Sequence, residues 1–75
     1  KQDIKEAVKW YLKAATKGYA KSQYTLGEIY SSGEGVKQDI KEAVKWYSKA
    51  AEQGDEDAQN RLDELKKQNM LSYQY

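Results

Sequence analysis

The chain has 75 residues and a formal net charge of +1, with 39% hydrophobic and 33% charged residues. At this size folding buries only about 60% of the surface that the unfolded chain exposes, so we expect one domain with a thin core. Cysteine and histidine are both absent, which excludes disulfides and removes the commonest zinc ligands and the usual general base. No apolar run is long enough to span a membrane. The first residue is not methionine and no signal segment follows it, so we interpret the chain as a fragment or a processed piece and leave its compartment open.

A long internal repeat sets the expected organisation. The segment from Lys1 to Gly18 recurs from Lys37 to Gly54, with 15 of 18 positions identical and a spacing of 36 residues. Such a period is typical of solenoid proteins, in which each unit buries its apolar face against its neighbours. We therefore expect a helical repeat domain over residues 1–67, with a partial repeat at 1–18, a complete repeat at 19–54 and a capping helix at 55–67, before a C-terminal tail at 68–75.

Each copy of the repeated segment is predicted to form a helix. Asp3 and Asp39 are placed to cap its first turn, each with a glutamate three residues later as in a capping box. Gly18 and Gly54 stand where many helices end on a left-handed residue. Apolar residues at three- and four-residue spacing define the face expected in the core: Ile4, Ala7, Val8, Tyr11, Ala14 and Ala15, matched by Ile40, Ala43, Val44, Tyr47, Ala50 and Ala51.

Residues 19–32, between the two copies, predict a further helix. Its apolar side is marked by Ser22, Leu26, Ile29 and Tyr30. Gly27 interrupts this helix at a cost of about 1 kcal/mol relative to alanine, which indicates that another helix approaches closely there. Residues 31–36 then form a glycine-containing loop whose last residue, valine, should pack back onto the helices.

The third cycle of the pattern is altered. Ala58, Leu62 and Leu65 keep the apolar spacing, but Asp63 and Lys66 replace the glycine and tyrosine of the preceding unit. A terminal repeat needs a polar outer face, so we expect residues 55–67 to form a capping helix. Residues 68–75 lack clear periodicity, which leaves open whether they fray, extend the capping helix or lie in a groove; a disordered tail is the favoured expectation.

These residues resemble the Sel-one-like repeat family, which is related to the tetratricopeptide repeats. The resemblance rests on Leu26-Gly27-x-x-Tyr30, Gly33-x-Gly35-Val36, Asp39, Ala43, Trp46-Tyr47, Lys49-Ala50-Ala51 and Gly54. It implies an all-α fold, an α/α right-handed superhelix of antiparallel helix pairs with about four helices in this chain. It also implies an adaptor or scaffold that binds other proteins, since members of the family are rarely enzymes.

Four aromatic residues occupy matching positions in the two copies. We interpret Trp10, Tyr11, Trp46 and Tyr47 as contacts between helices, because aromatic residues at helical spacing are usually part of a core. The first helix lacks a helix before it to cover its apolar flank, so we also expect an exposed flank there. End-to-end self-association at high protein concentration is the expected consequence.

The expected function is binding of a protein or peptide partner through the concave face of the helical array. If the first helix of each repeat lines this face, the candidate binding residues are Lys21, Tyr24, Thr25, Glu28 and Ser32. Tyr24 is the favoured anchor because aromatic residues dominate interface hot spots.

An alternative function uses the lysine rows of the second helices to bind an anionic ligand or a nucleic acid. The rows consist of Lys5, Lys9, Lys13 and Lys17 in the first copy and Lys41, Lys45 and Lys49 in the second. We expect no catalytic residues, cofactor or metal site. The acidic cluster from Asp55 to Asp57, with Asp63 and Glu64, is explained by the positive end of a helix dipole.

Overall fold

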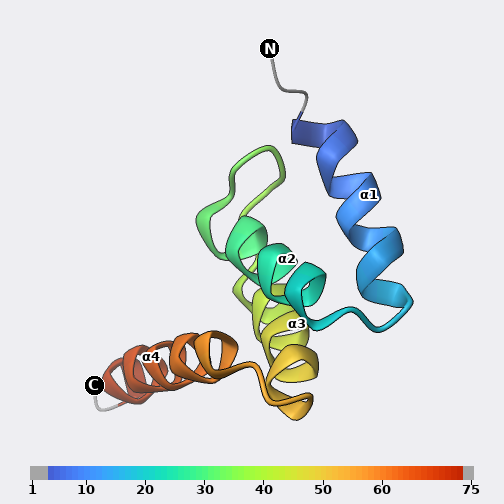
Figure 1. The fold of residues 1–75 in the computed structure, drawn as a ribbon. Coiled ribbons are helices and arrows are strands. Elements are labelled where there is room, and N and C mark those ends of the chain that lie inside the picture. Colours follow the sequence, from blue (N-terminus) through green and yellow to red (C-terminus); the bar gives the residue numbers. More distant parts are fainter. Residues whose placement is uncertain (1–3, 74–75) are drawn as a thin grey trace.

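The computed structural model describes residues 4–73, including the side chains of residues 4–68. Across this part of the chain the backbone forms four α-helices: α1 (Ile4–Thr16), α2 (Ala20–Ser32), α3 (Ile40–Glu52) and α4 (Glu56–Tyr73). Consecutive helices pack against each other as antiparallel pairs, with α2 and α3 at the centre and α1 and α4 on either side (Figure 1). The predicted all-α helical array is confirmed.

The helix ends follow the expected local chemistry with one exception. Asp39 accepts a hydrogen bond from the backbone N–H of Glu42 at 3.1 Å, as a capping residue should. The return half of the capping box is not formed, because the N–H of Asp39 donates to the carbonyl of Tyr30 at 2.9 Å. Gly18 and Gly54 have φ angles of 102° and 94°, so both adopt the predicted left-handed conformation. The corresponding cap at Asp3 lies outside the described residues.

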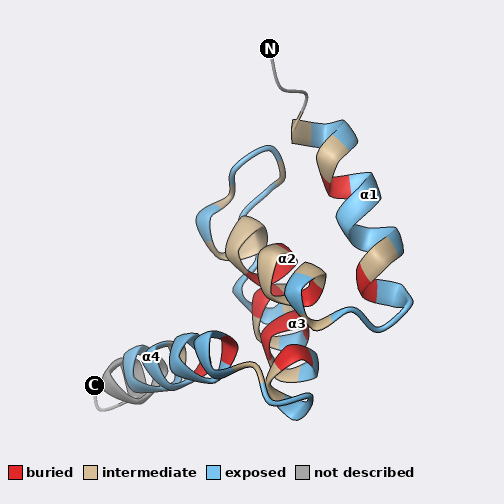
Figure 2. Cartoon of the chain, viewed as in Figure 1, coloured by how far each residue is buried: buried red, intermediate tan, exposed pale blue. Residues whose placement is uncertain are grey.

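The core consists of two small apolar clusters that both include residues of α3, and the buried positions are distributed over all four helices (Figure 2). Trp46 belongs to the cluster that also contains Leu26 of α2 and Val8 and Ala15 of α1. The next residue, Tyr47, belongs to the cluster formed with Ala43 and Ala50 of α3 and with Ala58 and Leu62 of α4. Two neighbouring aromatic residues therefore join α3 to different helices: Trp46 to α1 and α2, and Tyr47 to α4.

Gly27 brings α2 and α3 into close contact, as its position predicted. A Cβ atom at this glycine would lie 2.5 Å from the Cδ1 and Cε1 atoms of the Tyr47 ring. Val36 packs against the cluster around Trp46, so the loop does return to the helices. Ile40 differs from the prediction: its side chain is 41% exposed. Ile4, its counterpart, is half-buried because the loop at Gly35 covers it.

The last helix is longer than predicted. Asp55 caps it by accepting a hydrogen bond from the N–H of Ala58 at 3.0 Å. The helix then runs through Lys67 to Tyr73, so residues 68–73 are helical and are not the disordered segment that their sequence suggested. The remaining part of the expected tail, residues 74 and 75, lies outside the described residues.

Candidate protein-binding surface

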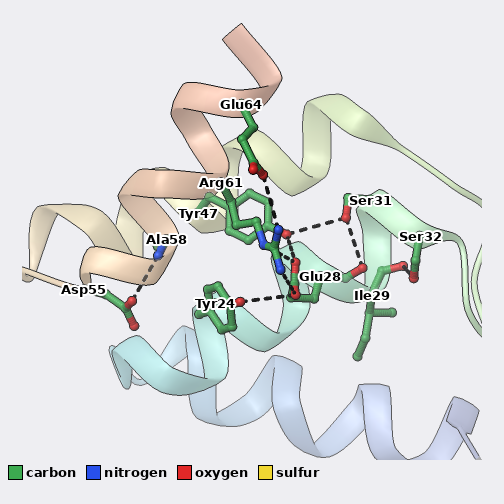
Figure 3. Close-up of polar contacts among 10 residues, drawn as sticks. All are labelled: Tyr24, Glu28, Ile29, Ser31, Ser32, Tyr47, Asp55, Ala58, Arg61 and Glu64. Carbon is green, nitrogen blue, oxygen red and sulfur yellow. Dashed lines mark hydrogen bonds and ion pairs between the residues drawn. The ribbon is translucent and has the colours of Figure 1, made fainter. Parts of the chain in front are cut away.

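A carboxylate on α2 is the centre of a polar cluster that joins three helices (Figure 3). Glu28 accepts hydrogen bonds from the hydroxyl of Tyr24 at 3.2 Å and from the hydroxyl of Tyr47. Its Oε2 atom forms an ion pair with Nε of Arg61 at 3.2 Å. Arg61 also pairs with Glu64 one turn further along α4, at 3.2 Å. We call these five residues the Glu28 cluster.

The hydroxyl of Tyr47 is the buried part of this cluster. The Tyr47 side chain is only 1% exposed, and its ring lies 5.8 Å from the ring of Tyr24. Burial raises the pKa of the Tyr47 hydroxyl above its ordinary value, and the hydrogen bond to Glu28 raises it further. The hydroxyl therefore stays protonated and acts as a donor, while the carboxylate of Glu28 acts as the acceptor.

Arg61 is the outer, solvated part of the cluster. Hydrogen bonding with Tyr24 and Glu64 and the negative charge of Glu28 raise the pKa of its guanidinium. The side chains of Arg61 and Glu28 are 45% and 37% exposed. Such exposed ion pairs contribute only about 0–1 kcal/mol to stability, so the pair orients two charges at the surface more than it stabilises the fold.

Three of the five predicted binding residues line one hollow beside the Glu28 cluster. The hollow has a volume of about 260 Å³ and is lined by Thr25, Glu28, Ile29, Ser31, Ser32 and Glu34. We call it the α2 hollow. The hydroxyl of Ser32 is held by the N–H of Glu34 at 3.3 Å, and it donates to the carbonyl of Ile29, also at 3.3 Å. This arrangement presents hydroxyl and carboxylate oxygens around a space about the size of one side chain.

The other two predicted residues lie apart from this hollow. Lys21 is exposed one turn before Thr25, whose hydroxyl donates to the Lys21 carbonyl at 2.9 Å. Tyr24 is half-buried and packs against the cluster of buried residues around Tyr47, so its ring covers α3. Its hydroxyl donates to Glu28 at 3.2 Å.

Sequence reasoning missed the amide contacts that join α1, α2 and the end of α3. Gln23 is 4% exposed, although it lies on the helix face beside Leu26, and its amide donates to the carbonyl of Ala15 at 3.0 Å. The amide of Gln53 donates to the Gln23 side chain at 3.0 Å and to the carbonyl of Gly18 at 2.7 Å. The sequence did contain a signal for these contacts: a glutamine next to a buried leucine, such as Gln23 beside Leu26, needs hydrogen-bond partners for its amide.

The lysine rows meet a second hollow, between α1 and α3. This α1–α3 hollow has a volume of about 540 Å³ and is lined by Leu12, Ala15, Thr16, Gly18, Gln23, Lys45, Trp46 and Lys49. Lys45 lies 5.0 Å from the centre of the Trp46 ring and also forms an ion pair with Glu42 at 3.4 Å. Only Lys45 and Lys49 of the predicted rows line the hollow.

Among the described residues, no three acidic side chains gather in a way that could hold a metal ion. None of the helices in that part of the chain has the length and apolar character needed to cross a membrane.

Comparisons with known proteins agree with the fold. The model of the Sel1 repeat family matches residues 1–19 and 20–55. A crystal structure of a Sel1 repeat protein from Oxalobacter formigenes is 45% identical with a TM-score of 0.84; the match covers 87% of this chain and 27% of that one. No curated protein matches the chain. Because the family model covers most of the residues and the structural match keeps the same helices, the chain belongs to the Sel1 repeat family.

Proposed function

We propose that this chain is a protein-interaction module that binds a protein or peptide through the concave face of its helical array, at the α2 hollow. Sel1 repeats are generally interaction scaffolds without catalytic activity, and this supports the general class. The chain matches only 27% of the solved Sel1 repeat protein, so the proposal concerns this module alone.

The observation that carries the proposal is that the carboxylate of Glu28 is held in place and still partly exposed. This carboxylate is held by Tyr24, Tyr47 and Arg61, yet its side chain remains 37% exposed at the edge of the α2 hollow. A partner would therefore meet a charge that is already oriented, which lowers the entropic cost of binding.

The α2 hollow favours a basic partner residue. Glu28 and Glu34 both line it, together with the hydroxyls of Thr25, Ser31 and Ser32, and none of the described lysines and arginines lines it; Arg61 pairs with Glu28 beside it. A lysine or arginine side chain of the partner would find two carboxylates and several hydroxyl acceptors there. Charge-assisted hydrogen bonds of this kind are stronger than neutral ones.

The test uses a residue that can fill the hollow without unfolding the chain. Ser32→Arg places a long cation in the hollow from an exposed helix end, so it should leave helicity unchanged. Partners are first captured with the full-length parent protein and identified by mass spectrometry. The affinity of each is then measured with purified chains, and Ser32→Arg should weaken it by about tenfold or more.

The matched control is Thr16→Arg, which adds the same charge at an exposed residue of the other hollow. It should leave the affinity unchanged. Equal affinity for Ser32→Arg and the wild type would contradict binding at the α2 hollow.

The α1–α3 hollow supports a second candidate function, binding of an anionic ligand or a nucleic acid. Lys45 and Lys49 line this hollow together with Trp46, and among the described residues no carboxylate lines it. Binding of a short fluorescent single-stranded oligonucleotide should then weaken steeply with salt and disappear in Lys45→Ala/Lys49→Ala. Absence of salt-dependent binding by the wild type would contradict this candidate.

A further inference from the structure

The two copies of the repeated segment differ at three of their 18 positions, and each difference involves the α1–α3 hollow. The differing pairs are Leu12 and Ser48, Thr16 and Glu52, and Lys17 and Gln53. Leu12 and Thr16 line the hollow. The amide of Gln53 donates to Gly18 at 2.7 Å and to Gln23 at 3.0 Å, and both of these residues line the hollow as well. The variation within the repeat is therefore concentrated at this one place.

Two of the differences make the hollow apolar and keep a carboxylate away from it. If the first copy had the residues of the second, serine would stand at the position of Leu12 and glutamate at that of Thr16. That glutamate would lie at a hollow which Lys45 and Lys49 also line. Thr16 instead provides a neutral wall, and Leu12, which is 41% exposed, adds apolar surface.

The polar groups at the floor of the hollow are used inside the chain. Gln23 is 4% exposed, and its amide donates to the carbonyl of Ala15 and accepts from Gln53. The hydroxyl of Thr16 donates to the carbonyl of Leu12 at 2.7 Å. A ligand would therefore meet mainly the Leu12 side chain and the two ammonium groups.

The two lysines stand in line along α3. Lys45 and Lys49 are four residues apart, so their side chains leave the same side of the helix about one turn from each other. Lys45 is held at the rim, because its ammonium lies 5.0 Å from the centre of the Trp46 ring and 3.4 Å from a carboxylate oxygen of Glu42. Within the described part of the chain no ion pair engages Lys49. Two cations beside an apolar surface match a ligand that carries several carboxylates around an apolar side chain.

A nucleic acid matches the hollow less well than an acidic peptide does. Single strands are bound largely by stacking their bases on aromatic side chains. Trp46 supplies the aromatic ring at this hollow, but it is only 5% exposed and Lys45 lies over its ring. The exposed apolar surface comes from Leu12, which packs against an aliphatic side chain but offers no ring for stacking.

We propose that the α1–α3 hollow binds an acidic segment of a partner protein, with an apolar side chain of the segment against Leu12 and its carboxylates at Lys45 and Lys49. The inference rests on the second candidate function, because it names the kind of anion that this hollow binds. It does not rest on binding at the α2 hollow, which has no lining residue in common with this one.

The first experiment titrates a defined peptide into the chain and follows its backbone amides by nuclear magnetic resonance. The probe is Glu-Glu-Leu-Glu-Glu, blocked at both ends. It should shift the amides of Leu12, Thr16, Lys45 and Lys49 in a saturable way. Replacing the leucine of the probe by serine should weaken binding about tenfold, because an apolar contact is lost.

The second experiment gives the first copy the residues of the second. Leu12→Ser/Thr16→Glu changes two exposed positions to residues that the same helix carries in α3, so helicity by circular dichroism should be unchanged. The variant should bind the probe about tenfold more weakly or worse, because a carboxylate then faces the two lysines. The matched control is Asn60→Glu, which adds the same charge at an exposed residue of α4 and should leave binding unchanged. Lys49→Gln, also at an exposed position, should weaken binding without any change to α1.

A short single-stranded oligonucleotide is the competing probe. If it shifts the amides of the hollow and the peptide does not, the acidic-segment proposal is overturned while anion binding at this hollow stands. If neither probe shifts them, both are overturned. Equal affinity of the wild type and Leu12→Ser/Thr16→Glu for the peptide, or shifts spread evenly over both lysine rows, would also contradict a binding site in the hollow.

Discussion

Helices α1 and α3 begin with the same eight residues, from Ile4 to Tyr11 and from Ile40 to Tyr47, but they occupy different environments. α3 lies between α2 and α4 and buries both of its aromatic residues. Among the described helices α1 packs only against α2, and Trp10 and Tyr11 are exposed, so they are not the contacts between helices that the sequence predicted. The reverse holds at the helix starts, where Ile4 is covered by the loop at Gly35 and Ile40 is exposed. The contrast shows that burial in a repeat array depends on the neighbouring elements, since local sequence is the same.

The largest expected difference concerns the two tryptophans. Trp46→Ala should lower the free energy of unfolding by about 3–5 kcal/mol, because it empties a space packed against α1 and α2. Trp10→Ala removes an exposed side chain and should change the free energy of unfolding by only about 0.5 kcal/mol. Urea unfolding followed by far-UV circular dichroism measures both values. Similar losses for the two variants would mean that α1 and α3 do not differ in solution as described.

A smaller loss is expected from one added methyl group. Gly27→Ala places a Cβ atom against the buried ring of Tyr47, which cannot move aside, so the two helices must separate. Overpacking of this kind costs about 1–3 kcal/mol. Asp63→Ala, at the matching position of α4, should leave the unfolding free energy unchanged or raise it, because Asp63 is exposed, its one described contact is an exposed hydrogen bond with Gln59 on the same helix, and alanine favours a helix. If Gly27→Ala were stabilising, the close contact of α2 with α3 would be contradicted.

The smallest effect is expected from a hydroxyl group. Tyr47→Phe removes the donor to Glu28 and should lower the unfolding free energy by about 1 kcal/mol near neutral pH. The pKa of Tyr47 is raised in the folded state, so this contribution is fully present below the ordinary tyrosine pKa of about 10 and is lost as the pH rises above it. The difference in unfolding free energy between the wild type and Tyr47→Phe should therefore shrink in alkaline solution, as measured by urea unfolding at a series of pH values.

The matched control is Tyr11→Phe, which removes the same hydroxyl from an exposed tyrosine of α1. It should change the unfolding free energy less than Tyr47→Phe does near neutral pH. A wild-type advantage over Tyr47→Phe that grows above pH 10 would contradict the described donor role of Tyr47.

Features that depend on neighbouring residues in the chain were well predicted. The cap at Asp39, the left-handed glycines at the helix ends and the apolar spacing of α2 and α3 follow from hydrogen bonding and helix geometry within a few residues. The close approach at Gly27 was also visible, because glycine in a helix has a cost that a tight contact explains. Three of the predicted binding residues, Thr25, Glu28 and Ser32, line the α2 hollow. Their role in binding stays a prediction.

Local propensity and the repeated apolar pattern predicted the number of helices, their period and their order, but not the end of α4 at Tyr73. Only the tertiary structure decided which copy of the aromatic pair is buried, because identical residues have identical local preferences. It likewise decided that Arg61 meets Glu28 across 33 residues and that Gln53 reaches Gly18 across 35. Such contacts join groups that lie far apart in the sequence and meet only after the helices have packed, so no local pattern could indicate them.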